Sequence, residues 1–181
     1  MKHQYFGDIN DYRKYGLLRA LLANTPLALR VAWMLTPDDG SSDGGFRSYL
    51  QQPDRWKRFD PELYAGLAAL AQRRAFPRVS LLGATDLLPG ATFFSDLVPD
   101  QLAQREVWST ALLRGVRGTE LVFLDPDNGI EVKSSPAGRR GSSKYVRWSE
   151  IEKIWSLGAS LLVYQHFPRK PRTELAAALL R

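Results

Sequence analysis

The sequence predicts an α/β protein, a Rossmann-like three-layer sandwich with a mostly parallel central sheet. Short apolar runs alternate with helix-like segments, as in proteins whose parallel strands are connected by crossover helices. Three of the apolar runs end in unusual polar sequences, and ligands bind beyond the carboxyl ends of the strands in such sheets. A chain of 181 residues corresponds to about one domain. We therefore expect a single α/β domain over residues 1–181, with an N-terminal helical segment over residues 1–24.

The elements follow one another in a regular order. Apolar runs predict the strands 29–36, 78–84, 91–95, 120–125 and 160–166. Helical periodicity and helix-start sequences predict helices over 11–23, 61–74, 100–114 and 148–157, with a further helix from Thr173. The Gly/Ser/Arg-rich stretch 134–143 is expected to be a mobile loop. The run 120–125 is the clearest buried strand.

Two helices carry readable signals for their ends and faces. Asn10 or Asp11 is expected to cap the helix over 11–23, and Ser149 is expected to cap the helix over 148–157. The first of these helices has an apolar face made by its leucines, Leu17, Leu18, Leu21 and Leu22.

The composition excludes several kinds of chemistry. The absence of cysteine excludes a disulfide scaffold, a zinc ribbon, an iron–sulfur cluster and a cysteine nucleophile. The two histidines, His3 and His166, are too few for a multi-histidine metal site. Because the sequence shows neither a signal-peptide pattern nor a long apolar run, we expect a soluble cytoplasmic protein. The 25 Lys and Arg against 19 Asp and Glu give a net charge of +6, which mildly favours an anionic partner such as nucleic acid.

Polar sequences follow three predicted strands. They begin Thr-Pro-Asp-Asp-Gly at Thr36, Asp-Pro-Asp-Asn-Gly at Asp125 and Tyr-Gln-His-Phe-Pro-Arg at Tyr164. Such residues are common in turns, so each loop taken singly is also compatible with turn formation alone. Because the carboxyl ends of parallel strands meet at one edge, the three loops together predict a site there.

The loop that begins at Asp125 contains the strongest candidate catalytic residues. Pro126 fixes the backbone beside Asp125, whose carboxylate could bind a metal, accept a proton or accept a hydrogen bond from an amino group. Asp127 and Asn128 bring a second carboxylate and an amide close to it. One alternative is a metal-dependent nuclease or phosphoesterase with Asp125, Asp127 and Glu131 as magnesium ligands. The spacing from Asp127 to Glu131 is shorter than in Pro-Asp…Glu-x-Lys nucleases, so the main interpretation includes no metal.

The loop after the first strand is the candidate cofactor site. Its candidate binding residues are Thr36, Asp38, Asp39 and Gly40. The glycine spacing differs from Gly-x-Gly-x-x-Gly, and the aspartates would repel a pyrophosphate. A cofactor with a cationic or amine-bearing end suits this loop better.

Basic residues gather near the same predicted edge. The candidate nucleic-acid contacts are Arg139, Arg140, Lys144, Arg147, Arg169 and Lys170. Tyr145, Trp148 and Tyr164 are interleaved with them and are suitable for base stacking or for ordinary packing. A solvated loop is the alternative interpretation of the basic stretch 138–147.

Residues 7–18 (GDINDYRKYGLL) resemble the opening Gly-Asn-x-x-Asp-x-x-Lys-His-x-x-Leu of the bacterial large-subunit ribosomal RNA adenine-N6 methyltransferases. The sequence Asp-Pro-Asp-Asn from Asp125 resembles that family's Asp-Pro-Pro-Tyr motif, with Asp127 and Asn128 in place of the second proline and the tyrosine. The resemblance implies a domain that binds S-adenosylmethionine, with Asp125 holding the target amino group and Lys14 near the cofactor or active site. It also places the Asp38–Gly40 stretch in the cofactor loop.

The resemblance leads us to expect a methyltransferase-like protein that acts on RNA or DNA. Methyltransferase folds often continue into further strands, so we also expect the chain to be truncated after Arg181. A further alternative is a non-catalytic nucleic-acid-binding module with the methyltransferase fold.

Overall fold

A parallel four-stranded sheet lies at the centre of the protein. The computed structural model describes residues 1–25, 27–40, 44–72, 78–166, 173–174 and 177. The sheet has the order β2-β1-β3-β6, and each neighbouring pair is parallel. Its strands are β1 (Leu29–Ala32), β2 (Thr92–Phe94), β3 (Leu121–Leu124) and β6 (Ser160–Val163). A separate parallel pair joins β4 (Gly129–Ile130) to β5 (Tyr145–Val146).

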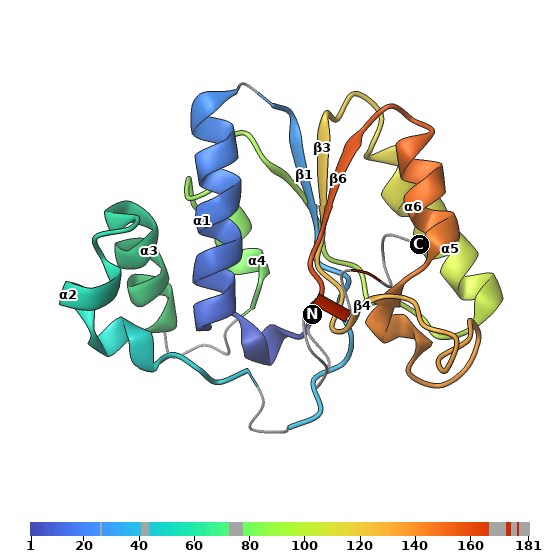
Figure 1. Cartoon of the computed structure of the whole chain (residues 1–181), viewed down its shortest axis with the longest axis horizontal. Helices are drawn as coiled ribbons and strands as arrows, with labels where there is room; N and C mark the ends of the chain where they lie inside the picture. Colours follow the sequence, from blue (N-terminus) through green and yellow to red (C-terminus); the bar gives the residue numbers. More distant parts are fainter. Residues whose placement is uncertain (26, 41–43, 73–77, 167–172, 175–176, 178–181) are drawn as a thin grey trace.

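Helices cover both faces of this sheet and complete the three predicted layers (Figure 1). On one side lie α1 (Ile9–Asn24), α3 (Pro61–Ala71) and α4 (Ser80–Gly83), and α2 (Pro53–Trp56) lies beyond them. On the other side lie α5 (Leu102–Arg114) and α6 (Trp148–Trp155). Short 3₁₀ turns occupy His3–Tyr5, Ser48–Gln51 and Ser142–Lys144. The prediction of a Rossmann-like α/β fold with a parallel sheet is confirmed.

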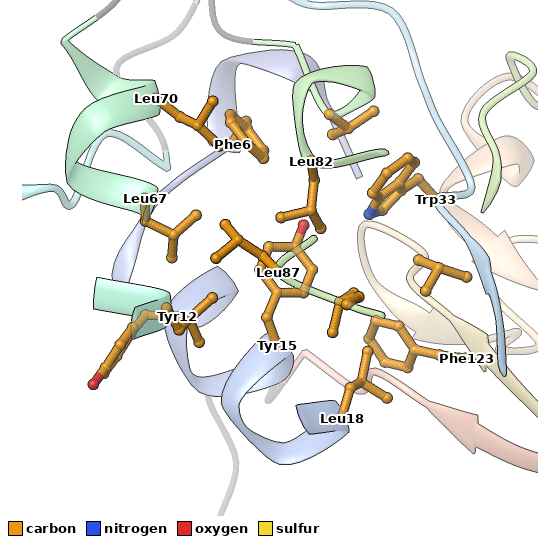
Figure 2. Close-up of a cluster of buried hydrophobic side chains, with 14 of the residues drawn as sticks. Phe6, Tyr12, Tyr15, Leu18, Trp33, Leu67, Leu70, Leu82, Leu87 and Phe123 are labelled. Atoms are coloured by element: carbon orange, nitrogen blue, oxygen red, sulfur yellow. The ribbon is translucent and has the colours of Figure 1, made fainter. Parts of the chain in front are cut away.

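Two apolar cores separate the layers. Every residue of β3 is buried, as expected for a central parallel strand that is covered on both faces. Figure 2 shows the larger core, where Tyr15 and Leu18 of α1 meet Trp33, Phe123 and the α3 and α4 side chains. The second core packs α5 and α6 against the opposite face. These cores fix the positions of the strand ends, from which the candidate site is built.

The buried face of α1 differs from the predicted one. Leu18 is buried, but Leu17 is 50% exposed and Leu21 is also exposed. Tyr12 and Tyr15 are buried instead, because the helix presents its aromatic stripe to the sheet and α3. The prediction of a leucine face was therefore correct for Leu18 and for the half-buried Leu22, and wrong for Leu17 and Leu21.

The predicted strand 78–84 is wrong. This segment contains the helix α4, in which Leu82 is buried in the larger core and Gly83 packs against Phe93. A short apolar run has no periodicity that separates a strand from a buried helix turn, so the sequence allowed both. The predicted strand 91–95 is confirmed as β2.

Helix caps correct two predictions, because neither Asn10 nor Asp11 caps the first helix and Ser149 does not cap the last one. Asp8 caps α1, because its Oδ1 accepts hydrogen bonds from the backbone N–H groups of Asn10 (2.8 Å) and Asp11 (2.9 Å). Helix α6 begins at Trp148, so Ser149 lies inside it and is not its cap. The Glu150 carboxylate accepts from the N–H of Arg147 at 3.0 Å at this end.

The basic loop 134–143 is held by a carboxylate. Asp100 accepts hydrogen bonds from the N–H groups of Gly141 (2.9 Å) and Ser143 (2.7 Å). Most of the helix expected from Thr173 lies outside the described residues. Within the described part of the chain, no helix is long and apolar enough to cross a bilayer.

Candidate functional site

A pocket of about 390 Å³ lies at the carboxyl edge of the sheet. It borders the ends of β1 and β3, the two neighbouring strands from which the chain leaves in opposite directions, β1 toward β2 and β3 toward β6. Such reversal points are where open α/β sheets bind ligands, and pockets of roughly 300–1,000 Å³ hold small molecules. Five carboxylates line the pocket, from Asp8, Asp11, Asp39, Asp125 and Asp127.

A buried cluster of three charges forms one wall of this pocket. The Lys14 Nζ lies 2.8 Å from Oδ1 of Asp11 and 2.8 Å from Oδ2 of Asp125. Asp11 and Lys14 are one turn apart on α1, whereas Asp125 follows β3 and is 111 residues away from Lys14. The Tyr164 ring covers the ammonium group, with its centroid 4.7 Å from Nζ. The structure thus brings together Lys14 and Asp125, two of the residues that the family resemblance singled out.

The cluster has more negative than positive charge, and its pKa values reflect this. Burial raises the pKa of Asp11 to about 6, against the attraction of Lys14, and the neighbouring Asp8 and Asp125 raise it further. Burial lowers the pKa of Lys14, but Asp11 and Asp125 outweigh it and hold that pKa well above its ordinary value. Two carboxylates share one ammonium, so the cluster gains a proton in mildly acidic solution.

We expect the Asp11 carboxyl to make stability depend on pH. Its pKa is higher in the folded protein than the ordinary 3.8, so its contribution is complete below about pH 4 and is lost as the pH rises through 6. Each pKa unit corresponds to about 1.4 kcal/mol, so the loss amounts to ~3 kcal/mol. Urea denaturation between pH 4 and 7 should show this fall for the native protein and a smaller one for Asp11→Asn. The matched control is Asp54→Asn on the exposed surface of α2, and a native-like fall in the Asp11 variant would contradict the prediction.

Asp127 connects the loops that follow β1 and β3. Its Oδ2 accepts a hydrogen bond from the Thr36 hydroxyl at 2.6 Å, and its Oδ1 is paired with the α-amino group of Met1. The same amino group donates to the carbonyl of Met34 at 3.1 Å, and the Thr36 N–H donates to the carbonyl of Met1 at 2.9 Å. Both carboxylate oxygens of Asp127 are engaged, so its side chain fixes the loops of the pocket.

The other predicted cofactor residues are divided between the pocket and solvent. Asp39 lines the pocket and forms an ion pair with Lys2. Asp38 is exposed and accepts a hydrogen bond from the Gln4 N–H at 3.2 Å. Gly40 is exposed and has a left-handed φ of 69°. The cofactor loop therefore contributes Asp39 to the pocket, whereas Thr36 is buried and reaches the pocket only through its hydrogen bond to Asp127.

Asn128 is positioned by its backbone. It lines the pocket, its N–H donates to the carbonyl of Lys144 at 2.9 Å, and its carbonyl accepts from Nε2 of Gln165 at 3.1 Å. Gln165 also accepts from the N–H of Ile130 at 2.9 Å through Oε1. Gln165 therefore holds the loop after β3 against the end of β6.

Only some of the predicted nucleic-acid contacts lie at or near the pocket. Lys144 lines the pocket, and Arg139 and Arg140 are exposed on the turn that Asp100 holds. Arg147 is 7% exposed, so it is not available to a nucleic acid at the surface. Two further predicted contacts, Arg169 and Lys170, lie outside the described residues.

The carboxylates of the alternative metal site make separate contacts. Asp125 pairs with Lys14 and Asp127 with the Met1 amino group, while Glu131 accepts a hydrogen bond from the Trp148 N–H at 2.8 Å. Among the described residues, no group of three or more His, Asp or Glu side chains is placed to hold a metal ion.

Sequence reasoning missed two kinds of pocket residue. Asp8 and Asp11 were not chosen as site residues, although their Gly-Asp-x-x-Asp spacing was a usable signal. The aromatic side chains of Tyr5 and Phe46 also line the pocket. Gly44 permits the position of Tyr5, because a Cβ at Gly44 would lie 1.9 Å from that ring. Neither the hydrophobic periodicity nor the composition of the sequence predicts that Tyr5 and Phe46 line the pocket.

Comparison with models of protein families, with curated proteins and with solved structures found no match.

Proposed function

We propose that this pocket binds S-adenosylmethionine and that the protein transfers the methyl group to an amino group of a nucleic acid. The observation that carries the proposal is the position of Asp125. It lies at the end of the central strand β3, in the pocket at the reversal point of the sheet, with Lys14 fixing its carboxylate at 2.8 Å. The position agrees with the motif resemblance, which gives Asp125 the target amino group.

The residues present fit the two ends of such a cofactor. The amino-acid end of the cofactor carries an ammonium and a carboxylate. At the pocket, the ion pair of Asp39 and Lys2 offers a group of opposite charge to each, and the Asp39 side chain is 48% exposed. The adenine ring of the cofactor needs a flat apolar partner, which Tyr5 and the exposed ring of Phe46 provide. The carboxylates of the pocket favour a cationic sulfonium over a pyrophosphate.

The cofactor supplies a methyl group that is already activated for transfer. Asp125 would accept a hydrogen bond from the attacking amino group and orient its lone pair toward that methyl carbon. A carbon–nitrogen bond forms as the carbon–sulfur bond breaks, and sulfur keeps the bonding electron pair. The amine then releases one proton, which the Asp11 and Asp125 carboxylates can accept before it passes to water. Lys14 keeps Asp125 in place throughout.

Positive charge near the pocket supports a nucleic acid as the acceptor. Lys144 lines the pocket, and Arg139 and Arg140 lie exposed on the adjoining turn. The whole chain carries a net charge of +6. Phosphate contacts by Lys and Arg provide most of the sequence-independent affinity of nucleic-acid-binding proteins.

A second candidate is a non-catalytic nucleic-acid-binding module. One observation favours it: Asp125 and Asp127 are both engaged in ion pairs, as expected of residues that hold loops together.

Transfer of a radioactive methyl group from S-adenosylmethionine to RNA and DNA tests the proposal. We expect the native protein to label one of them, and Asp125→Asn to be slower by about 10²–10³-fold because the positioned negative charge of the carboxylate is lost. Asp86→Asn serves as the control and should label at the native rate, because Asp86 is exposed and does not line the pocket. Incorporation by Asp125→Asn at the native rate would contradict the role of Asp125. Oligonucleotide binding without any incorporation would favour the non-catalytic module.

A further inference from the structure

A second surface of the molecule combines aromatic rings with exposed positive charge. An open groove of about 530 Å³ lies between α1 and the segment 55–59, whose sequence is Arg-Trp-Lys-Arg-Phe. Its lining includes Tyr12, Arg13, Trp56 and Phe59. We call Arg13 together with residues 55–59 the basic-aromatic surface. It lies on the α2 side of the molecule, away from α5 and α6 (Figure 1).

Positive charge dominates this surface. Its four basic side chains are exposed, and they are Arg13, Arg55, Lys57 and Arg58. Two nearby acids share one positive charge, because Arg19 lies 2.7 Å from Asp60 and 2.5 Å from Glu62, and together the three groups leave a single negative charge. Asp54 is an exposed acid on the same helix, so an excess of positive charge remains.

The aromatic rings of the surface lie among its guanidinium groups. The Trp56 ring centroid is 5.2 Å from Arg55 and 5.8 Å from Arg13, and the Phe59 centroid is 4.9 Å from Arg58. Phe59 is 65% exposed, so its ring is accessible to a bound molecule. The Tyr12 hydroxyl donates to the carbonyl of Trp56 at 2.8 Å, which fixes the segment to α1. The rings and charges are therefore presented from a fixed backbone.

We propose that the basic-aromatic surface binds a single-stranded segment of nucleic acid, and this proposal depends on the proposed function for its choice of substrate. Single strands are bound by aromatic rings that stack on bases and by basic groups that contact phosphates. Both features occur here within five consecutive residues and one neighbouring arginine. A duplex would keep its bases stacked on one another, so it would leave the Phe59 ring without a partner.

The position of the surface connects it to the pocket of Asp125. Asn10, Asp11 and Lys14 of α1 line that pocket, whereas Tyr12 and Arg13 line the groove on another face of the same helical turns. An α-helix with its side chains is roughly 10–12 Å across. A strand bound to the basic-aromatic surface can therefore continue around the start of α1 and present a nearby unpaired base to the pocket.

Fluorescence anisotropy with a labelled single-stranded oligonucleotide, tested as RNA and as DNA, measures this binding. The variant is Arg55→Glu/Arg58→Glu, and the control is Arg114→Glu/Arg117→Glu at the end of α5, which changes the net charge equally. We expect the first variant to bind at least about tenfold more weakly and the control to change by less than about twofold. The salt dependence should become shallower by about 0.7 for each lost phosphate contact.

Phe59 provides a test of stacking that does not change charge. We expect Phe59→Ala to weaken binding by about fivefold or more with an unchanged salt dependence, and Phe59→Tyr to bind like the native protein. Equal weakening by the two charge variants would overturn the proposed surface and leave the methyltransferase proposal standing. Absence of oligonucleotide binding, or binding to anionic phosphatidylserine vesicles instead, would overturn the proposal that this surface binds single-stranded nucleic acid. Titration of S-adenosylmethionine would then decide the cofactor proposal separately.

Discussion

Replacing Lys14 with methionine is expected to reduce the free energy of unfolding by about 3–5 kcal/mol near neutral pH. The Asp11 and Asp125 side chains are each 1% exposed and share the Lys14 ammonium group. Methionine fills a similar volume but leaves both carboxylates buried without their cation, and burial of an unpaired charge is strongly unfavourable. The effect should shrink below about pH 6, because Asp11 then takes up a proton.

Urea denaturation of the native protein and of Lys14→Met measures this effect directly. Lys144→Met is the matched control, because Lys144 lines the same pocket and the described residues show no ion pair for it. We expect the control to change stability by less than about 0.5 kcal/mol. A Lys14→Met protein as stable as the control at neutral pH would show that the three-charge cluster does not hold α1 to the end of β3.

Replacing Arg105 with methionine is expected to have an effect of similar size on the opposite side of the sheet. Arg105 is fully buried and binds Glu150 through two hydrogen bonds of 2.6 and 2.8 Å. It also donates to the carbonyl of Tyr145 at 2.9 Å and packs over the ring of Trp108. Methionine would leave Glu150 buried and unpaired, at a cost of about 3–5 kcal/mol.

A double-mutant cycle with Glu150→Leu separates the pair from its surroundings. Because the second substitution removes the orphaned carboxylate, we expect Arg105→Met/Glu150→Leu to recover much of the stability that Arg105→Met loses. Glu150 also accepts a hydrogen bond from the Arg147 N–H, so some loss should remain. Strictly additive losses in the double variant would contradict a specific coupling between Arg105 and Glu150.

The centre of the sheet was predictable because its two middle strands, β1 and β3, are largely buried. The run 120–125 has an apolar centre, Leu-Val-Phe-Leu, and this property is local in the sequence. The run 78–84 has the same property but is too short to show whether it is a strand or a helix turn. Fold class therefore followed from the sequence, while the identity of one short element depended on its packing.

The candidate site was predictable as a set of residues but not as a set of contacts. Lys14 and Asp125 were both identified from motifs, yet their ion pair depends on how α1 lies against the end of β3. Charge alone also gave no sign that Arg105 and Arg147 are buried, because arginine is usually exposed. Contacts across long stretches of sequence come from the tertiary fold, which local patterns do not encode.

Calorimetric titration of the native protein with S-adenosylmethionine tests the central claim most directly, with adenosine triphosphate as the anionic comparison. We predict one binding site per chain for S-adenosylmethionine, with a Kd between about 1 μM and 1 mM, and much weaker binding of the triphosphate because the pocket carboxylates repel it. The absence of a binding signal at millimolar S-adenosylmethionine, or tighter binding of the triphosphate, would contradict the account.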